Sequence, residues 1–422
     1  MKILVLGPGA REHAIVKALL SEKAGHEITC APGNAGIAAD VTCVNINAND
    51  PAEATALAQE LGAELVVIGP EAPLVAGVAD AIRAVGIPVF GPNQAAAALE
   101  GSKTFAKRIM DAANVPTGGA VRATTLAEAE AAIDQFGAPY VIKADGLAAG
   151  KGVLVSSDRD AALEHCRYWL GHGPVLVEEF LDGQEVSLFM FADGHDVLPL
   201  SPAQDYKRIF DNDEGPNTGG MGAYSPLPWL DAQFGSEAEF VDEVIDTIAL
   251  PTVRQLEAEG TPFQGLLYCG LILTAKGIRV IEFNARFGDP ETQVVLPRLV
   301  TPLSELLLAS ATGTLGGRAK PEFSSDVAVT VVLASENYPE TPVTGRVLTG
   351  LAEAEAVPGV HIAHAATALH GEDMIATGGR VLSVVARGTD FADARARAYQ
   401  AVNKITLEGG QFRTDIAKRV AE

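Results

Sequence analysis

At 422 residues, the chain exceeds the size of one ordinary hydrophobic core, and its length predicts about two to four domains. Its hydrophobic content of 48%, with 43 glycines and 24 prolines, is typical of a compact, turn-rich α/β protein and excludes an intrinsically disordered one. The net charge of −23 argues against a protein that binds nucleic acid or anionic membranes, so anionic substrates would need basic residues gathered at one site.

The cysteines and the N-terminus indicate the compartment. The four cysteines form no CxxC pair (Cys30, Cys43, Cys166 and Cys269), which favours free thiols over a disulfide framework or a zinc site. The first residues turn polar too early for a signal peptide, and no apolar run approaches membrane-spanning length. We therefore expect a cytoplasmic protein.

The first hundred residues alternate short apolar runs with helical patterns. Strands are predicted over 2–6, 65–68 and 88–90, and helices over 11–21 and 74–85. This order is typical of an open parallel sheet, whose ligands bind beyond the carboxyl ends of the strands. After the first strand, Glu12 replaces the third glycine of a dinucleotide motif. A phosphate held by the helix N-terminus and Arg11 is therefore favoured over nicotinamide, with a purely structural turn as the alternative.

The character of the sequence changes after residue 101. A helix is predicted over 103–113, followed by strands over 140–143, 153–155 and 175–179 and a helix over 160–170. A long glycine-rich loop is expected over 205–224, a helical region over 237–257, and paired strands over 265–273 and 278–284. A β-rich unit begins near residue 326 and ends in a helix over 391–404. We expect an N-terminal open-sheet substrate domain over 1–101, a central domain over 102–325 with a smaller nucleotide-covering unit at about 117–190, and a C-terminal domain over 326–422.

Three segments suggest a nucleotide site. The run VIKADGLAAGKGVLV (141–155) places strand-like residues around a glycine-rich turn whose backbone N–H groups can close over phosphates, with charge from Lys143 and Lys151. In VLVEEFLDGQEV (175–186), the end of a strand could read adenine and Glu185 the ribose. Lys207 and Arg208 begin a second glycine-rich passage, and loops this long are usually functional. For these three segments the alternatives are, respectively, a hairpin with solvated lysines, an acidic surface loop and a disordered surface loop.

The run VIEFNARFGDPETQ (280–293) carries the candidate metal ligands. Strand residues alternate faces, so Glu282 and Asn284 project to the same side. A carboxylate and an amide oxygen suit Mg²⁺, which often shares its ligands with nucleotide phosphates. The alternative is an amphipathic strand with a charged outer face, followed by a turn that contains Asp289 and Glu291.

Taken in order, seven segments resemble the ATP-grasp ligases and, more closely, the phosphoribosylamine–glycine ligase (glycinamide ribonucleotide synthetase) family: GPEAPLVAGVAD, EGSKTFAK, VIKADGLAAGKGV, EEFLDGQE, QDYKR, GPNTGGMGAYSP and EFNARFGDPETQ. The likeness runs from REHA near the N-terminus to FRTDIAKR near the end. It implies an α/β fold with an N-terminal open parallel sheet, a central ATP-grasp fold of two α+β subdomains, and a β-rich C-terminal domain.

The resemblance also implies a reaction in de novo purine biosynthesis. In that family ATP phosphorylates the glycine carboxylate, and the amine of 5-phosphoribosylamine displaces phosphate from glycyl phosphate to form glycinamide ribonucleotide. Mg²⁺ or Mn²⁺ is the expected cofactor. A transient contact with the preceding pathway enzyme would hand over the labile amine, although no segment of the sequence signals it.

The roles of individual residues are implied only by the motifs that match the family. ATP contacts are expected from Lys103, Lys143, Gly146, Gly150, Lys151, Gly152, Glu178, Glu179, Leu181 and Glu185, and metal ligation from Glu282 and Asn284. The expected catalytic residues are Arg286, Asp289, Asp205 and Lys207. Substrate contacts are expected from Gly9, Arg11, Glu12, His13, Gly69, Pro70, Glu71, Gly219, Gly220, Met221, Gly222 and Glu291.

Two departures from the family pattern stand out. Many ATP-grasp enzymes carry another metal-binding acid on the strand before the EFN strand, whereas this chain has LLYCGLIL with Cys269, which predicts fewer protein ligands to the metal. The run ASENYP (334–339) is less glycine-rich than its family counterpart. Other ATP-grasp carboxylate–amine ligases or carboxylases, and a nucleotide-binding module without catalysis, remain the alternatives.

Overall fold

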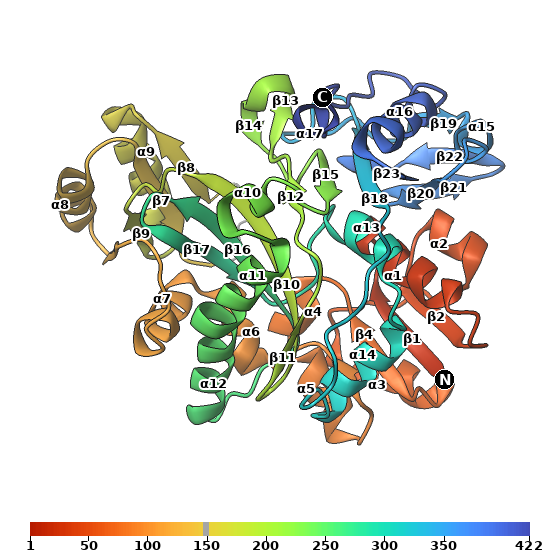
Figure 1. Ribbon diagram of the computed structural model, residues 1–422, viewed down its shortest axis with the longest axis horizontal. Helices are drawn as coiled ribbons and strands as arrows, with labels where there is room; N and C mark the ends of the chain where they lie inside the picture. The colour runs from red at the N-terminus through yellow and green to blue at the C-terminus, as the bar shows by residue number, and fades with distance from the viewer. Residues whose placement is uncertain (147–151) are drawn as a thin grey trace.

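The computed structural model of the chain describes residues 1–146 and 152–422. Its N-terminal part is a parallel sheet of order β3-β2-β1-β4-β5, as expected (Figure 1). The strands are β1 (Lys2–Gly7), β2 (Glu27–Pro32), β3 (Thr42–Cys43), β4 (Leu65–Ile68) and β5 (Val89–Phe90), and α1 (Ala10–Ser21), α2 (Ala35–Asp40), α3 (Pro51–Leu61) and α6 (Gln94–Gly101) connect and cover them. The apolar runs of β1 and β4 are buried, as is typical of parallel strands covered on both faces.

One predicted helix of this sheet was wrong in its extent. The region predicted as one helix over 74–85 consists of α4 (Glu71–Val75) and α5 (Val78–Ala84). Gly77 separates the two with φ +82°, a left-handed conformation that interrupts a helix and that glycine adopts at little cost.

The central part contains two antiparallel sheets. The smaller sheet has the order β6-β9-β7-β8 and protrudes at one end of the molecule, covered by α8 (Leu126–Phe136) and α9 (Arg159–Leu170) (Figure 1). Its strands are β6 (Ala120–Ala123), β7 (Tyr140–Ala144), β8 (Val153–Ser156) and β9 (Val175–Glu178). The larger sheet has the order β11-β10-β16-β17, formed by β10 (Gln184–Asp193), β11 (Val197–Pro199), β16 (Gln264–Thr274) and β17 (Gly277–Asn284). Helices α7 (Lys103–Ala112), α11 (Glu237–Val244) and α12 (Leu250–Ala258) lie nearby, with a π-helical turn over Ile245–Ala249 between the last two.

The C-terminal part is built on the sheet β12-β15-β18-β23-β20. Its strands are β12 (Gln204–Asp205), β15 (Gly222–Ser225), β18 (Val327–Ala334), β20 (Val360–His364) and β23 (Arg380–Gly388), with α16 (Phe391–Val402) packed on β18 and β23. A second small sheet has the order β21-β22-β19-β24, formed by β19 (Val347–Thr349), β21 (Thr367–His370), β22 (Asp373–Ala376) and β24 (Thr406–Leu407).

The passage over 205–224 is not the long loop predicted from the sequence. It forms the end of β12, a hairpin of β13 (Arg208–Phe210) and β14 (Glu214–Asn217), and the start of β15. Strand β15 pairs with β18, more than a hundred residues later in the chain, so local sequence pattern could not reveal it. A Cβ atom on Gly222 would lie 2.7 Å from the carbonyl oxygen of Thr330, so the close pairing explains this glycine.

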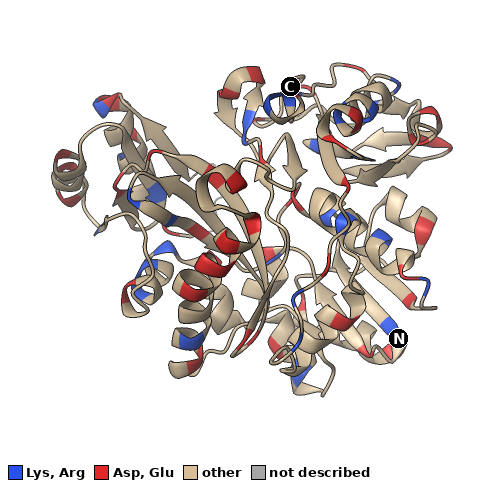
Figure 2. Cartoon of the chain, viewed as in Figure 1, with Lys and Arg blue, Asp and Glu red and all other residues tan. Residues whose placement is uncertain are grey.

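Acidic side chains are spread over the N-terminal, central and C-terminal parts of the chain, and several lie on α11 (Figure 2). All four cysteines are free thiols. Among the described residues, no helix is both long enough and apolar enough to cross a membrane.

Candidate active site

The first group of candidate residues lies between the two central sheets. The ammonium group of Lys143 on β7 is buried, contacts Oε2 of Glu178 at 2.9 Å and donates to the carbonyl of Ile281 at 3.1 Å. Lys107 contacts the same Glu178 oxygen at 3.6 Å. Burial alone would lower the pKa of Lys143, but Glu178 and Glu282 outweigh it and raise the pKa. Lys143 therefore stays charged at the contact between the sheets.

Glu282 lies beside this lysine on β17. Burial would raise the pKa of its carboxyl group, but the lysines nearby (Lys143, Lys207 and Lys103) lower it overall. Within 1–146 and 152–422, the Glu282 carboxylate makes no hydrogen bond or ion pair. Gly270 on β16 is the residue paired with Glu282. A Cβ atom on Gly270 would lie 3.3 Å from Cγ of Glu282, so the glycine leaves space beside the acidic side chain. The site thus presents an ionised carboxylate that has no partner among the residues the structure describes.

The donor set of β17 fits a hard divalent cation. The carboxylate of Glu282 and the amide oxygen of Asn284 are oxygen ligands on one face of the strand, as Mg²⁺ or Mn²⁺ prefers. The expected position of a further acid is taken by Cys269, which is buried opposite Phe283. Among the described residues, no group of three or more His, Cys, Asp or Glu side chains could hold a metal ion. A cation held by Glu282 and Asn284 would then take its other ligands from water and substrate oxygens.

Glu185 and Lys207 lie next to Glu282, and Asp205 lies beside Lys207. Glu185, Lys207 and Glu282 line one small cavity. Lys207 forms an ion pair with Glu185 and lies 3.8 Å from Oδ1 of Asp205. Burial, with Glu291 and Glu185 nearby, raises the pKa of Asp205 to about 7, although Lys207 acts in the opposite direction. We call Lys143, Lys207, Glu178, Glu185, Asp205 and Glu282 the lysine cluster.

A buried hydrogen-bonded group borders the lysine cluster. Tyr268 donates to Oε1 of Glu291 at 2.6 Å, and Ser187 lies 2.7 Å from the Tyr268 oxygen and 3.2 Å from the same carboxylate oxygen. Tyr268 and Ser187 also line the cavity that contains Lys207 and Glu282. The carboxylate of Glu291 is therefore fixed by two hydroxyl groups that local sequence pattern did not indicate.

Arg286 organises the second group of candidate residues. Its guanidinium contacts Oε1 of Glu100 at 3.0 Å and Oε2 of Glu71 at 3.3 Å. The other oxygen of Glu100 accepts from the backbone N–H of Ala285 at 2.7 Å. Burial raises the pKa of Glu100 despite the opposing charge of Arg286. Glu71 was expected here, and Glu100, which begins the EGSKTFAK motif, was not.

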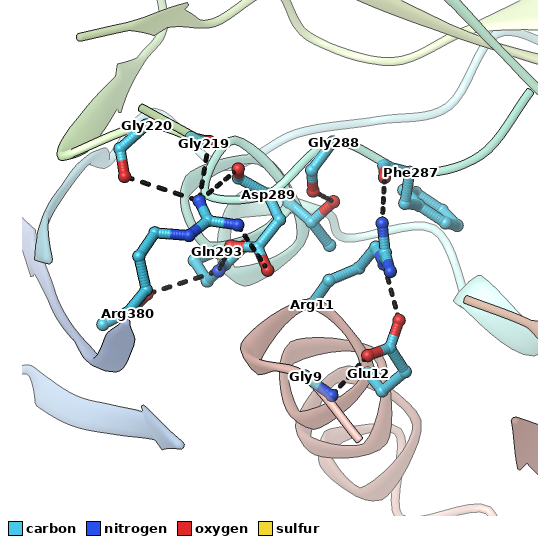
Figure 3. A network of polar contacts seen from close by, with 12 residues as sticks. Gly9, Arg11, Glu12, Gly219, Gly220, Phe287, Gly288, Asp289, Gln293 and Arg380 are labelled. Carbon is cyan, nitrogen blue, oxygen red and sulfur yellow. Dashed lines mark hydrogen bonds and ion pairs between the residues drawn. The ribbon is translucent and has the colours of Figure 1, made fainter. Parts of the chain in front are cut away.

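The N-terminal turn packs against the RFGDP turn (Figure 3). Arg11 contacts Glu12 at 2.5 Å and donates to the carbonyl of Phe287 at 3.1 Å. The N–H of Gly9 donates to the same carboxylate at 2.6 Å. A Cβ atom on Gly69 would lie 1.9 Å from Oε1 of Glu12, so the buried acid occupies the space that the glycine leaves. We call Arg11, Arg286 and Arg380, with Glu12, Glu71, Glu100 and Asp289, the arginine cluster.

Asp289 and the turn over 219–222 complete the arginine cluster. Burial would raise the pKa of Asp289, but Arg380, Arg11 and a hydrogen bond from Gln293 lower it overall. Gln293 donates to Oδ1 at 2.7 Å, and Nη2 of Arg380 lies 3.5 Å from Oδ2 (Figure 3). Met221 is buried and packs with Ile209. Arg380 comes from β23, and no local motif had indicated it.

His13 faces away from these groups. Its Nδ1 accepts from the backbone N–H of His364 at 2.9 Å, so Nε2 carries the proton that it donates to Asp40 at 2.8 Å. Burial chiefly lowers the pKa of His13. The imidazole therefore holds the N-terminal turn against the C-terminal part of the chain.

The expected adenine hinge follows β9. The N–H of Glu179 donates to the carbonyl of Gly119 at 2.8 Å, and its carboxylate accepts from the N–H of Gly119 at 3.1 Å. Leu181 lies beside Gly118. On the phosphate side, Lys103 donates to the carbonyl of Gly146 at 3.3 Å. Gly152 accepts from the N–H of Ala144 at 2.8 Å, while Gly150 and Lys151 lie outside the described residues.

Family models place these groups in a known enzyme family. The phosphoribosylglycinamide synthetase N domain matches residues 1–100, its ATP-grasp (A) domain residues 101–292, and its C domain residues 328–419. The chain belongs to the phosphoribosylamine–glycine ligase family. It is therefore a carbon–nitrogen ligase with an ATP-grasp domain.

Individual relatives match along the whole chain. The phosphoribosylamine–glycine ligase of Leifsonia xyli is 71% identical over 422 residues, covering 99% of this chain and all of that protein. That of Streptomyces coelicolor is 57% identical, and both chains are covered in full. The crystal structure of the Thermotoga maritima enzyme superposes with a TM-score of 0.82 at 33% identity, covering 98% of this chain and 100% of the other. These matches confirm the predicted family and fold class.

More distant structures support the fold alone. The biotin carboxylase domain of 2-oxoglutarate carboxylase from Hydrogenobacter thermophilus, solved with MgADP and bicarbonate, has a TM-score of 0.69 at 17% identity, covering 97% of this chain and 91% of that one. The identity is too low to transfer that protein's ligands to this chain.

Proposed function

We propose that the protein joins glycine to 5-phosphoribosylamine, converting ATP to ADP and phosphate and forming glycinamide ribonucleotide through glycyl phosphate. The observation that carries the proposal is the lysine cluster, where an ionised Glu282 lies among lysines and pairs with no residue of the described ranges 1–146 and 152–422. Family membership narrows the substrates to those that give the family its name.

In the first step, an oxygen of the glycine carboxylate attacks the γ-phosphorus and ADP leaves. Lys143, Lys103 and Lys207 would neutralise the phosphate oxygens, because their charges already converge on Glu282. A Mg²⁺ or Mn²⁺ ion held by Glu282 and Asn284 would add charge neutralisation and fix the phosphate geometry. The hinge near Glu179 and Leu181 would hold adenine through backbone groups, and Glu185 would bind the ribose.

In the second step, the amine of phosphoribosylamine attacks the carbonyl carbon and phosphate leaves. The attacking nitrogen must lose a proton as the amide forms. Asp205 is suited to accept it, because its pKa of about 7 leaves it half ionised near neutral pH. Glu291, fixed by Tyr268 and Ser187, would bind the ammonium group of glycine.

The arginine cluster would fix the shape of the acceptor side, the part of the site where phosphoribosylamine binds. Arg286 joins Glu71 and Glu100, and Arg11 joins the N-terminal turn to Phe287, so the two turns meet in a fixed arrangement. Such preorganisation keeps an amine and an acyl phosphate in reacting positions.

The test is a coupled assay for ADP with purified protein, ATP, Mg²⁺, glycine and freshly generated phosphoribosylamine. We expect sustained ADP release only when glycine and phosphoribosylamine are both present. Replacing glycine by alanine, formate or bicarbonate is the specificity control. Equal turnover with another acid, or release that ignores phosphoribosylamine, would contradict the proposal.

A further inference from the structure

The backbone N–H and the backbone carbonyl of Gly219 are both held by side chains of the C-terminal part. The N–H of Gly219 donates to the hydroxyl oxygen of Tyr338 at 2.9 Å. Its carbonyl accepts from Nη1 of Arg380 at 2.7 Å. Arg380 is the first residue of β23, and Tyr338 lies in the ASENYP run after β18. Two side chains more than a hundred residues away thus fix the two peptide groups on either side of Gly219 Cα.

Arg380 also reaches the RFGDP turn (Figure 3). Its Nη1 donates to the carbonyl of Asp289 at 2.7 Å, and its Nη2 lies 3.5 Å from Oδ2 of that residue. A weaker contact joins it to the carbonyl of Gly220 at 3.4 Å. A planar guanidinium can serve several acceptors in fixed directions, whereas an ammonium group is a compact point charge. One arginine therefore connects the glycine turn to Asp289.

The glycines of this turn are explained by close protein contacts. A Cβ atom on Gly219 would lie 2.9 Å from Cζ of Arg380. Gly220 has φ +113°, and a Cβ atom there would lie 2.4 Å from Cδ of Pro290. The side chain that sets the position of Gly219 is therefore Arg380 itself.

The backbone of the turn is largely occupied by protein partners. The N–H of Gly220 donates to Thr218 Oγ1 at 3.0 Å, and the N–H of Met221 donates to the carbonyl of Tyr206 at 2.7 Å. The carbonyl of Met221 accepts from the N–H of Val332 at 3.0 Å. These groups are engaged and are not offered to a phosphate. The contribution of the turn is its shape and its contact with the Asp289–Pro290 peptide.

We propose that Arg380 and Tyr338 are positioning residues for the acceptor half of the reaction. They hold the turn over 219–222 against Asp289, and they act through these groups rather than by touching the reacting atoms. The inference rests on the proposed function, in which the arginine cluster, Asp289 included, fixes the shape of the acceptor side of the site. The C-terminal part of the chain would then contribute to the reaction by holding this turn in place.

The experiment compares Arg380→Lys and Tyr338→Phe with Arg387→Lys. Arg387 is a matched control, because it lies on the same strand and pairs with Asp326 at 2.5 Å. We expect Arg380→Lys to lower kcat/KM for glycine and phosphoribosylamine by about tenfold or more, while the KM for ATP changes less than about twofold. Tyr338→Phe removes one hydrogen bond and should cost about threefold, and Arg387→Lys should match the parent protein.

A second readout follows the turn itself. Amide hydrogen exchange in a peptide spanning 218–222 should accelerate in Arg380→Lys and Tyr338→Phe and stay unchanged in Arg387→Lys. Unchanged kinetics and exchange in Arg380→Lys would overturn the inference. So would an equal loss for all three substrates with a lowered Tm, which indicates structural support only. If the parent protein itself shows no turnover with glycine and phosphoribosylamine, the proposed function fails, while the exchange rates still decide whether these side chains hold the turn.

Discussion

The lysine cluster and the arginine cluster use their charges in different ways. In the first, Glu282 makes no ion pair with any described residue, and lysines converge on it from three segments of the chain. In the second, Arg286, Arg11 and Arg380 are engaged by carboxylates and carbonyl groups of the protein. The first arrangement leaves charge for a ligand, and the second uses charge to fix the shape of a site. The comparison predicts that substitutions in the two clusters fail in different ways.

The largest effect is expected for Glu282→Gln. The substitution keeps the size of the side chain but removes the charge that would hold the divalent cation, so kcat should fall by about a hundredfold or more. Folding should be nearly unchanged, because no described residue pairs with this carboxylate. The measurements are turnover against Mg²⁺ concentration and Tm, with Asp246→Asn, an exposed site, as the control. A variant with normal turnover would remove Glu282 from the metal shell.

A smaller loss of turnover, joined to a loss of stability, is expected for Arg286→Lys. A lysine cannot contact Glu71 and Glu100 in the fixed directions of a guanidinium, and it leaves a buried carboxylate poorly paired. We expect kcat/KM for phosphoribosylamine to fall by about tenfold, equivalent to about 1.4 kcal/mol, with a measurable drop in Tm. Loss of activity at unchanged Tm would contradict this, because it would mean that Arg286 offers its charge to a ligand, as the lysine cluster does, and does not stabilise the fold.

The next largest effect is expected in the pH dependence of kcat, which should differ between substitutions in the two clusters. Asp205, with a pKa of about 7, must be ionised to accept the proton of the amine, so kcat should rise as the pH increases through about 7 and then level off. Asp205→Asn should lower kcat and abolish that inflection, whereas Arg286→Lys should lower the whole curve without moving it. The measurement is a pH–rate profile from pH 5.5 to 9 at saturating substrates. An inflection that persists in Asp205→Asn would assign it to another group.

The smallest effect concerns stability at the contact of the N- and C-terminal parts. Burial lowers the pKa of His13, and burial with nearby His13 and Lys17 lowers that of His364 to about 4. Both histidines are neutral in the folded and unfolded states above the unfolded pKa of about 6.5, so stability is full there. As the pH falls below about 6.5, the unfolded state binds protons first and stability falls. For His364, with a folded pKa of about 4, the loss should be about 1.4 kcal/mol per pH unit between about pH 6.5 and 4. Denaturant unfolding at several pH values measures this slope, and His364→Phe should flatten it.

The sequence was most informative where candidate residues follow one another in a single motif. Glu282 and Asn284 lie two positions apart on β17, so strand alternation is enough to relate them, and Arg286 and Asp289 follow in the next turn. The parallel sheet was equally accessible, because buried apolar runs and glycine turns are local signals. The parallel sheet was predicted and is confirmed, whereas the roles of the residues on β17 and its turn stay predictions.

Partners distant in the chain were beyond such reasoning. Arg380 meets Gly219 across 161 positions, and the N–H of Ala285 meets Glu100 across 185. Strand β15 was missed because its pairing with β18 depends on tertiary structure, and glycine-rich segments have low strand propensity. The arginine cluster is built mostly from such contacts, and the lysine cluster mostly from motifs.

The most direct test of the account uses glycine labelled with ¹⁸O in its carboxylate. If the lysine cluster transfers phosphate to that carboxylate and the acceptor side then receives the amine, one labelled oxygen must leave with phosphate. We predict inorganic phosphate that carries one ¹⁸O for each glycinamide ribonucleotide formed. Product formation with unlabelled phosphate would contradict glycyl phosphate as the intermediate and the division of labour between the two clusters.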